Sequence, residues 1–360
     1  ERSNDQFKEN IIEGLNWLDI NYDDEIIIQS ERLKRHQEIA HKLIKNNGAF
    51  KCICSQSTLE KKREYNRKNK INLKRLCEIC EENMEIQSLT KGYTVRIKIA
   101  NTQETSINDI VQGRVIVKNE EIDNFIILRE DGSATYMLSA VVDDFDMGIN
   151  LVIRGDDHLN NTFRQFFIYN NMNWQIPEYA HIPLIHGEDG KKLSKRHGAV
   201  DIIELKQQGY LKESIINNLI LLGWSTPNLS EIILIDEIIN LFDIKKISKS
   251  SSIFSYEKLN FINNSYIKDD TNFDKLFNYC IFNQTLQNYI EKDRDKFKKI
   301  FMIHKKNIKK YKDLEIICPI YFEENYISNK INSAENSFVE LLIDFISTIQ
   351  KLKVWDIESM

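Results

Sequence analysis

A group of positively charged residues marks the stretch HGEDGKKLSKRHGAV, residues 186–200. Its cations and the glycines around them are Lys191, Lys192, Lys195 and Arg196, with Gly187, Gly190 and Gly198. Glycine permits backbone conformations that other residues resist, and lysine carries a compact charge on a flexible stem. Such a loop could close over a polyphosphate and stabilise the charge that develops when pyrophosphate leaves. A solvated basic turn is the alternative interpretation.

Four cysteines in the first quarter of the chain form two close pairs. Cys52 and Cys54 are separated by one residue, and Cys77 and Cys80 by two. Four thiolates are enough for a tetrahedral zinc site. A metal-free loop with reduced thiols is the alternative, and the sequence does not decide between the two.

The elements that must position these side chains change along the chain. Apolar residues recur at helical spacing in two segments between residues 5 and 47, which predicts two helices, and Gly48 is predicted to end the second. Residues 50–90 show no clean period and are rich in Cys and Lys. This change of pattern indicates an insertion.

Several strands are predicted further along. Segments 93–100 and 113–119 alternate or are rich in β-branched residues, and a turn at 131–132 follows another strand. Residues 151–154 predict a buried strand, which a polar turn joins to a helix beginning near residue 161. Strand, turn and helix form the unit of a parallel α/β sheet. Ligands of such sheets bind beyond the carboxyl ends of the strands.

Four sequence blocks together carry a family resemblance. The segment KLSKR (192–196) is similar to the KMSKS signature of class I aminoacyl-tRNA synthetases, and PLIHGEDGKKLSKRHGA around it resembles the glutamyl form. DGSATYMLSAVVDDFDMGINLVIRGDDHLNNTFRQ (131–165) is similar to the same family in the same order. NNLILLGWS (217–225) and IFSYEKLNFINNSYI (253–267) resemble its stem-contact and domain-joining segments. The chain thus resembles the bacterial-type glutamyl-tRNA synthetases.

The resemblance implies an α/β fold. We expect an incomplete class I synthetase catalytic domain of the Rossmann type, with an inserted acceptor-binding subdomain and an all-α helical region after it. The implied divisions are 1–48 and 131–203 for the catalytic domain, 49–130 for the insertion, 204–267 for a helical stem-contact region and 268–360 for part of a helical anticodon-binding domain.

The implied activity is the ATP-dependent ligation of L-glutamate to tRNA(Glu) through glutamyl-adenylate, with Mg²⁺ accompanying ATP. The α-carboxylate attacks the α-phosphate of ATP, so positioning and charge stabilisation are most of the catalysis. By the family pattern, Lys192 and Lys195 contact the triphosphate and Ser194 contributes a hydroxyl. Backbone groups of Leu184 and Ile185 are expected to face the adenine.

Four further residues are expected to bind the small substrates. A guanidinium matches a carboxylate through two charge-assisted hydrogen bonds, so Arg154 is predicted to bind the glutamate side chain, together with the Tyr136 hydroxyl. By the family pattern Asp157 also lines the glutamate site and His158 the ATP site. The alternatives are a salt bridge from Arg154 to Asp156 or Asp157, and a core position for Tyr136.

The insertion is expected to bind the acceptor end of tRNA. Its predicted phosphate contacts are Lys61, Lys62, Arg63, Arg67, Lys68 and Lys70. A solvated helix face is the alternative. Some bacterial members of the family carry a zinc knuckle in this insertion, which agrees with the cysteine pairs, although the spacing here differs.

The composition, with 42% hydrophobic and 29% charged residues, is that of a folded protein. No apolar run could span a bilayer and no secretory signal is evident, so we expect a cytoplasmic protein that binds no membrane. The remaining cysteines, Cys280 and Cys318, lie on apolar helical patterns that favour buried packing. Net charge is −5, which excludes a uniformly basic coat while allowing local basic patches. We expect a monomer.

Both ends differ from the family pattern. Members begin with a strand and a His-Ile-Gly-His-type motif ahead of the segment that starts here as ERSNDQ, and KLKVWDIESM resembles a point inside the anticodon-binding region. We therefore expect this chain alone not to activate glutamate. Three alternatives remain: a glutaminyl-type synthetase, a non-catalytic tRNA-binding derivative, and the shortened paralogue that modifies a tRNA base. Whether tRNA(Gln) is also charged is left open.

Overall fold

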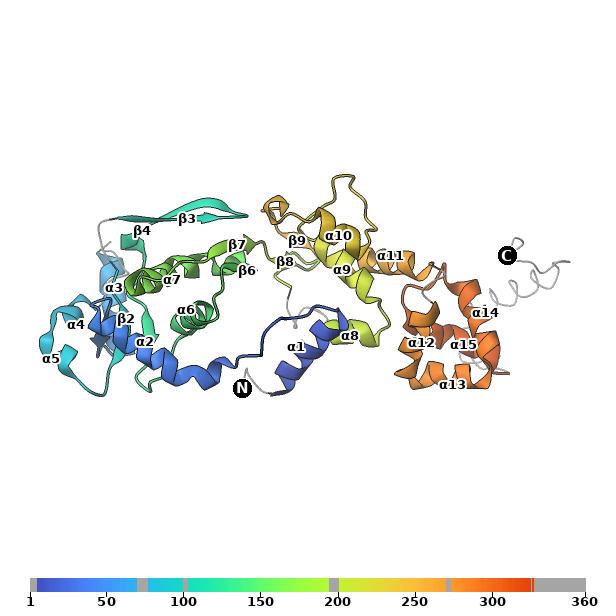
Figure 1. The fold of residues 1–360 in the computed structure, drawn as a ribbon, viewed down its shortest axis with the longest axis horizontal. Coiled ribbons are helices and arrows are strands. Elements are labelled where there is room, and N and C mark those ends of the chain that lie inside the picture. Colours follow the sequence, from blue (N-terminus) through green and yellow to red (C-terminus); the bar gives the residue numbers. More distant parts are fainter. Residues whose placement is uncertain are drawn as a thin grey trace.

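The computed structural model describes residues 5–69, 77–99, 103–193, 201–269, 273–324 and 326. Three residues with predicted roles lie outside these ranges: Lys70, Ser194 and Lys195. Figure 1 shows an elongated molecule, with strands and helices mixed at one end of the long axis and a group of helices at the other.

Two helices begin the described chain, as predicted. They are α1 (Asp5–Trp17) and α2 (Leu33–Lys45), and a 3-10 turn, η1 (Gln29–Arg32), precedes the second. The second helix ends just before Gly48, again as predicted. Its apolar stripe is buried and its opposite face is exposed, which is the pattern of a surface helix on a core.

The first sheet has three antiparallel strands, in the order β1-β2-β5: β1 (Ala49–Cys52), β2 (Thr94–Ile97) and β5 (Ile126–Leu128). The strand predicted over 93–100 is therefore confirmed as β2. Strand β1 is its partner and was not predicted, because three of its four residues lie inside a segment without clean periodicity.

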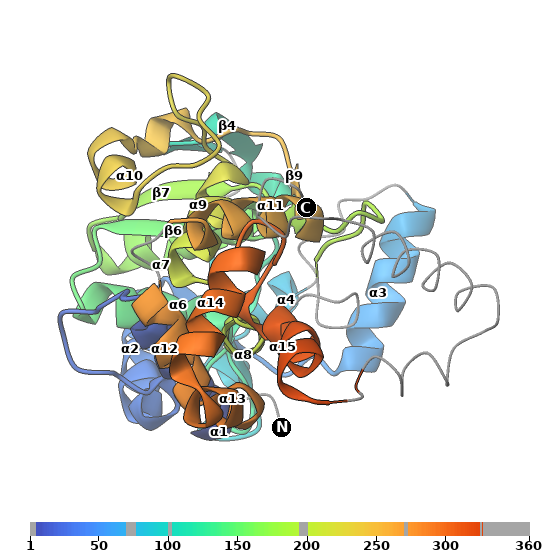
Figure 2. The same ribbon diagram turned by 90° about the vertical axis from the view of Figure 1, so that its right-hand side faces the viewer.

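Three helices lie between β1 and β2: α3 (Gln56–Lys68), α4 (Glu78–Glu82) and α5 (Met84–Ser88). Figure 2 shows α3 standing to one side of the rest of the fold. Its first turn is capped by Ser55, whose side-chain oxygen accepts a hydrogen bond from the amide of Thr58.

The second sheet has the order β4-β3-β7-β6. Its strands are β3 (Glu104–Asp109), β4 (Gly113–Lys118), β6 (Leu151–Gly155) and β7 (Glu178–Ile182). β3 and β4 form an antiparallel hairpin, while β7 runs parallel to both β3 and β6. The strand predicted over 113–119 is confirmed as β4, and β3 is its unpredicted partner.

The prediction of a buried strand at 151–154 was wrong in one respect. The strand exists as β6, but it lies at the edge of the described sheet and Ile153 is 54% exposed. A 3-10 turn, η3 (Asp156–His158), leads into α7 (Leu159–Met172), which begins two residues before the predicted start. An apolar run in a single sequence does not distinguish an edge strand from a central one.

Side-chain hydrogen bonds connect helix α6 (Tyr136–Asp146) to η1 and α2. The Asp143 carboxylate accepts hydrogen bonds from Gln29 Nε2 at 2.8 Å and Arg32 Nε at 2.7 Å, and lies 2.8 Å from His36 Nε2. Burial would raise the pKa of Asp143, but these hydrogen bonds hold it below its ordinary value. The first residue of α6, Tyr136, is thereby held on a fixed element.

One apolar core joins the first sheet to α2, α6 and α7. Its buried residues include Leu43, Val95, Ile127, Leu138 and Ile168. This core crosses the predicted boundaries at 48/49 and 130/131, and the domain division remains a prediction.

The second half is helical, as predicted. Its helices are α8 (Ile202–Gln207), α9 (Lys212–Leu221), α10 (Ile235–Leu241), α11 (Tyr256–Ile267), α12 (Phe273–Ile281), α13 (Gln284–Lys292), α14 (Arg294–His304) and α15 (Leu314–Phe322). A short strand, β9 (Ser252–Ile253), pairs in parallel with β8 (Ile185–His186). Cys280 and Cys318 are both buried in the apolar core of these helices, as predicted. Among the described residues, no helix combines the length and apolar character needed to cross a membrane.

Candidate active site

The structure brings two predicted side chains together, Arg154 from the end of β6 and Tyr136 from the start of α6. Arg154 Nη1 lies 3.4 Å from the Tyr136 hydroxyl. Tyr136 is 46% exposed, so it is not a core aromatic residue, which was the alternative interpretation. Together they place a cation and a phenol beside solvent, at the carboxyl end of a strand that runs parallel to its neighbour.

Residues that were not predicted to belong to the substrate site hold Arg154 in place. Its Nε donates to His181 Nε2 at 3.1 Å, and its Nη2 donates to Thr162 Oγ1 at 2.7 Å and Gln165 Oε1 at 2.9 Å. No acidic residue is paired with Arg154 in the part of the chain that the structure describes, so the alternative of a salt bridge to Asp156 or Asp157 finds no support there.

His181 is itself bound to a buried carboxylate. Its Nδ1 lies 2.6 Å from Asp109 Oδ2, and both side chains are fully buried. Asp109 also accepts from the backbone amides of His181, Val111 and Gln112. Burial lowers the pKa of His181. Burial opposes ionisation of Asp109, yet its hydrogen bonds keep the pKa below the ordinary value.

The basic loop begins beside the same turn. Lys192 Nζ donates to Asp157 Oδ2 at 2.7 Å, and this hydrogen bond lowers the pKa of Asp157. The loop is a tight hairpin, because the amide of Leu193 donates to the carbonyl of Ile185 and Gly190 takes a positive φ of 73°. Lys192 and Asp157 are therefore brought together, whereas Ser194 and Lys195 lie outside the described residues.

Of the residues predicted to line the ATP site, Leu184 and Ile185 lie at this hairpin. A Cβ on Gly155 would meet Asp157 Oδ1 at 2.7 Å and Leu184 Cδ2 at 3.3 Å, so the β6 turn and the segment before β8 approach closely. His158 lies 5.8 Å from Tyr136 between ring centroids. Adenine contacts by Leu184 and Ile185, and a role for His158, remain predictions.

The four cysteines of the insertion share one small core. The sulfur atoms of Cys52, Cys54 and Cys80 all lie within 4.8 Å of one another, and Cys54 Sγ is 3.4 Å from Cys80 Sγ. Cys77 is buried in the same cluster and hydrogen-bonds to Cys52, which lowers the pKa of the Cys52 thiol. Desolvation raises the pKa of Cys80 to about 11. This donor set suits zinc, which binds thiolates tetrahedrally and would displace the thiol protons.

The predicted tRNA contacts in the described range lie on α3. Lys61, Arg63, Arg67 and Lys68 are exposed, and Lys62 is half-buried. The helix projects from the fold, which leaves these cations accessible (Figure 2). Lys70 lies outside the described residues.

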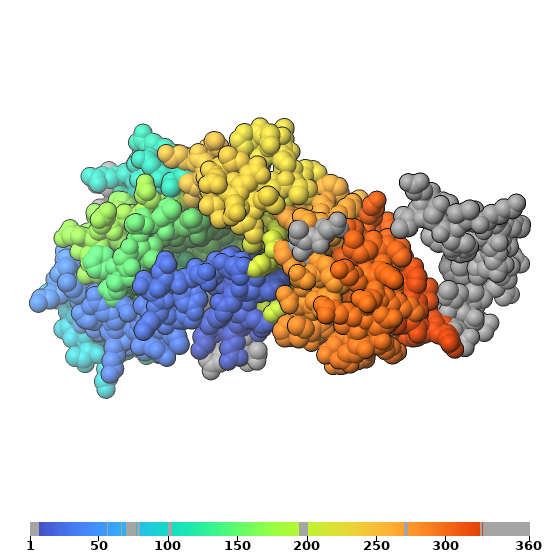
Figure 3. All heavy atoms as spheres, turned by 45° about the vertical axis from the view of Figure 1, so that its right-hand side comes forward, coloured from blue at the N-terminus to red at the C-terminus, as the bar shows by residue number. Residues whose placement is uncertain are grey.

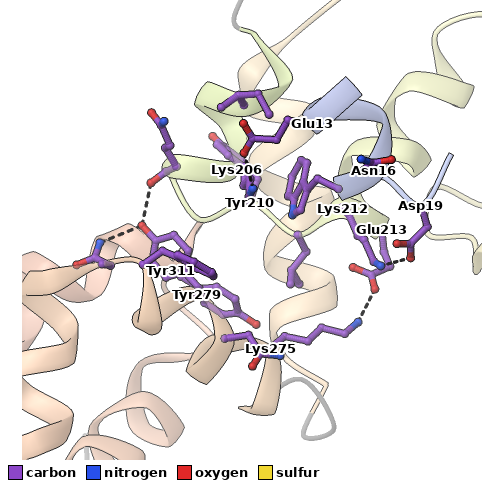
Figure 4. A pocket seen from close by; sticks show the side chains of 17 residues that line it. Glu13, Asn16, Asp19, Lys206, Tyr210, Lys212, Glu213, Lys275, Tyr279 and Tyr311 are labelled. Carbon is purple, nitrogen blue, oxygen red and sulfur yellow. Dashed lines mark hydrogen bonds and ion pairs between the residues drawn. The ribbon is translucent and has the colours of Figure 1, made fainter. Parts of the chain in front are cut away.

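A separate pocket lies where α1, α8, α9 and α12 meet (Figure 4). Three ion pairs span it: Glu13–Lys206, Asp19–Lys212 and Glu213–Lys275. They join α1 to α8, the segment just after α1 to α9, and α9 to α12. Figure 3 shows the blue N-terminal segment close to the orange helices here. Among the described residues, none of those predicted to bind a substrate lines this pocket.

Comparisons with known proteins agree with this geometry. The family model described as "tRNA synthetases class I (E and Q), catalytic domain" matches residues 1–261. The glutamate–tRNA ligase 2 of Zymomonas mobilis is 39% identical over 365 residues, covering 100% of this chain and 76% of that protein. The glutamate–tRNA ligase 2 of Ehrlichia chaffeensis is 45% identical over 266 residues, covering 74% of this chain and only 56% of that protein.

Solved structures show the same fold. A glutamate-tRNA synthetase from Elizabethkingia anophelis superposes with a TM-score of 0.73 at 25% identity, covering 88% of this chain and 71% of that one. A glutamate tRNA ligase from Elizabethkingia meningosepticum, solved with its amino acid, gives a TM-score of 0.74 at 24% identity, covering 98% and 78%.

Proposed function

The chain belongs to the class I tRNA synthetases of the glutamate and glutamine type, and we propose that it serves the ATP-dependent ligation of L-glutamate to tRNA(Glu) through glutamyl-adenylate. Because the chain covers 76% of one relative and 56% of another, the activity is proposed for the full-length gene product. The observation that supports it most is the pair of Arg154 and Tyr136 at the carboxyl end of β6.

The reaction requires the glutamate α-carboxylate to attack the α-phosphorus of ATP as the bond to pyrophosphate breaks. Arg154 and Tyr136 would hold the far carboxylate of glutamate, so that the near one is oriented toward the nucleotide. Lys192 would leave Asp157 and donate to the triphosphate, stabilising the negative charge on the departing pyrophosphate. The family resemblance assigns Lys195 and Ser194 to the same loop, and Mg²⁺ would accompany ATP.

Glutamate-dependent ATP–pyrophosphate exchange tests this proposal. In the full-length product, Arg154→Ala is expected to lower kcat/KM for glutamate by about a hundredfold to a thousandfold, because a charge-assisted contact is lost. Arg164→Ala is the matched control, since Arg164 pairs with Asp123 on the surface of α7 and should leave exchange unchanged. Equal values of kcat/KM for glutamate in Arg154→Ala and Arg164→Ala would refute the role of Arg154.

The same assay separates the alternatives. Exchange with glutamine in place of glutamate would indicate a glutaminyl-type enzyme. Retained tRNA binding without exchange for any amino acid would indicate a non-catalytic derivative. Charging of tRNA(Gln), a cytoplasmic location and a monomeric state are finer parts of the proposal, which charging assays with both tRNAs, cell fractionation and sedimentation would test.

Binding of the tRNA acceptor end is proposed for the exposed cations of α3. Replacing Lys61, Arg63 and Arg67 with alanine is expected to weaken tRNA binding and to reduce the slope of log K against log salt by about two to three. Glutamate-dependent exchange measures the other site and should be unaffected unless it requires tRNA. An unchanged salt slope would identify α3 as a merely solvated face.

Zinc is proposed for Cys52, Cys54, Cys77 and Cys80, on the strength of their clustered sulfur atoms. The ion would stabilise the insertion, because these four residues belong to a separate small core. Metal analysis of the purified protein is expected to find about one zinc per chain, and Cys54→Ser to abolish it. Cys280→Ser, in the helical core, is the control. Zinc-free protein with an unaltered thermal midpoint would refute this part.

A further inference from the structure

Most hydrogen-bond donors of Arg154 are directed at other groups of the protein. Nε is directed at His181, and Nη2 at Thr162 and Gln165. The remaining nitrogen, Nη1, lies next to the hydroxyl of Tyr136. Nη1 and the Tyr136 hydroxyl are thus the groups left to meet a ligand.

The tautomer of His181 follows from these contacts. Arginine has no acceptor, so the short contact from Arg154 Nε requires His181 Nε2 to be unprotonated. The ring proton must then sit on Nδ1, where it is donated to Asp109 Oδ2 at 2.6 Å. Asp109 can only accept when ionised, and three backbone amides help to keep it so. The Thr162 hydroxyl, 3.1 Å from Nε2, is able to donate to the same lone pair.

The same reasoning fixes the hydrogen-bond direction at Tyr136, the exposed residue of this chain of contacts. Because Arg154 only donates, the Tyr136 oxygen accepts from Nη1. The phenolic proton of Tyr136 is then free to point at a ligand. Arg154 Nη1 therefore presents a proton to a ligand, and the Tyr136 hydroxyl, whose oxygen already accepts from Nη1, is oriented to donate its own proton.

We propose that Asp109 and His181 are positioning residues that fix the hydrogen-bond directions of Arg154 and Tyr136, so that the site selects a carboxylate over an amide. A carboxylate accepts from both groups. The NH₂ of a glutamine side chain would face donors and leave a polar group unpaired, which is a strong basis for rejection. This inference rests on the proposed function and assigns its glutamate-over-glutamine specificity to two residues that do not touch the ligand.

Two substitutions of His181 separate positioning from simple structural support. A glutamine amide reaches about as far as Nε2 and an asparagine amide about as far as Nδ1. His181→Gln can therefore keep an acceptor for Arg154, whereas His181→Asn keeps only the donor to Asp109. We expect the ratio of kcat/KM for glutamate to that for glutamine to stay within about threefold in His181→Gln, and to fall about tenfold to a hundredfold in His181→Asn.

Asp109→Asn provides an independent test of the same chain of contacts. An asparagine NH₂ facing Nδ1 favours the other tautomer, which would set Nε2–H against Arg154 Nε–H. The KM for glutamate is expected to rise about tenfold or more while the KM for ATP is unchanged. Thr105→Val is the matched control, since it removes a buried hydrogen bond to Asn119 from the same strand without touching Arg154. A selectivity ratio that falls as far in this control as in His181→Asn would overturn the proposal.

A spectroscopic measurement keeps this inference separable from the proposed function. Nitrogen chemical shifts of ¹⁵N-histidine-labelled protein report the tautomer of His181 without any turnover, with His181→Gln used to assign the signal. A neutral ring protonated at Nδ1 in the unsubstituted protein is expected, and a ring protonated at Nε2 would overturn the inference even if glutamate is activated. Absence of glutamate-dependent exchange in the unsubstituted full-length product would instead overturn the proposed function, and the specificity claim with it.

Discussion

Two polar regions of this molecule differ in how much water reaches them. Around Arg154, the partners His181 and Asp109 are fully buried. At the pocket between α1, α9 and α12, the ion pairs are at least partly exposed: the side chains of Lys212 and Asp19 are 31% and 68% exposed, and those of Lys275 and Glu213 are 41% and 16% (Figure 4).

The difference teaches what each region is able to do. Water and salt screen exposed charges, so such pairs contribute little to stability. Buried hydrogen bonds are stronger, and a buried donor or acceptor left without a partner lowers the stability of the fold. The Arg154 region can therefore fix one geometry for a ligand, whereas the ion pairs at the pocket are expected to contribute little to holding its helices together.

The largest expected effect is on the buried side of this comparison. Asp109→Ala leaves the His181 ring proton and three backbone amides without their acceptor. We expect it to lower the free energy of unfolding by about 3–5 kcal/mol. Urea denaturation would measure this, with Thr105→Val, expected at about 1 kcal/mol, as the control. Equal losses in the two variants would show that the buried contacts of Asp109 stabilise the fold no more than one ordinary buried hydrogen bond.

A smaller effect should appear as a pH dependence. Burial lowers the folded-state pKa of His181 below 6.5, although Asp109 opposes this shift, and the charges of Arg154 and His158 add to it. His181 therefore contributes stability that is fully present above pH 6.5 and is lost as the pH falls toward the folded-state pKa, because only the unfolded chain takes up the proton. The free energy of unfolding should fall less between pH 7 and pH 5 in His181→Gln than in the unsubstituted protein. Parallel losses would contradict a buried neutral His181.

The ion pair between α9 and α12 should matter less. Lys275 Nζ donates to Glu213 Oε1 at 2.6 Å from a half-exposed position. Lys275→Met is expected to lower the free energy of unfolding by at most about 1 kcal/mol, and less in high salt. Denaturation at low and at high NaCl would measure it. A salt-independent loss of several kcal/mol would mean that this pocket is as rigid as the Arg154 region.

The smallest effect is expected for the most exposed partner. Asp19 pairs with Lys212 on α9, and Asp19 is largely in solvent. Asp19→Asn should change the free energy of unfolding by about 0.5 kcal/mol or less. The thermal midpoint should shift less in Asp19→Asn than in Lys275→Met, because the Asp19 side chain is the more exposed partner. A larger shift for Asp19→Asn would contradict this prediction.

Much of the fold was open to prediction because its signals are local. The periodicity of α1 and α2 and the helical second half were each predicted from neighbouring residues. Strand β1 was missed because it is short and its partner β2 is distant in sequence. Strand β3 was missed although its partner β4 follows it closely, because β3 mixes polar with apolar residues. For β6, the sequence indicated a strand and not its edge position. Ser194 and Lys195 lie outside the described residues, so their roles stay predictions.

By itself, the sequence indicated the family of this protein and picked out candidate substrate-binding side chains, because motif spacing and residue type are properties of short segments. Tyr136 and Arg154 are recognisable in one continuous block of sequence. Which donors of Arg154 remain for a ligand was decided only by the tertiary structure. Asp109 and His181 come from strands β3 and β7 and meet only when those strands pair. In the proposed arrangement, Asp109 holds the ring proton on His181 Nδ1, which leaves Nε2 free to accept from Arg154. That contact does not exist until the sheet has formed.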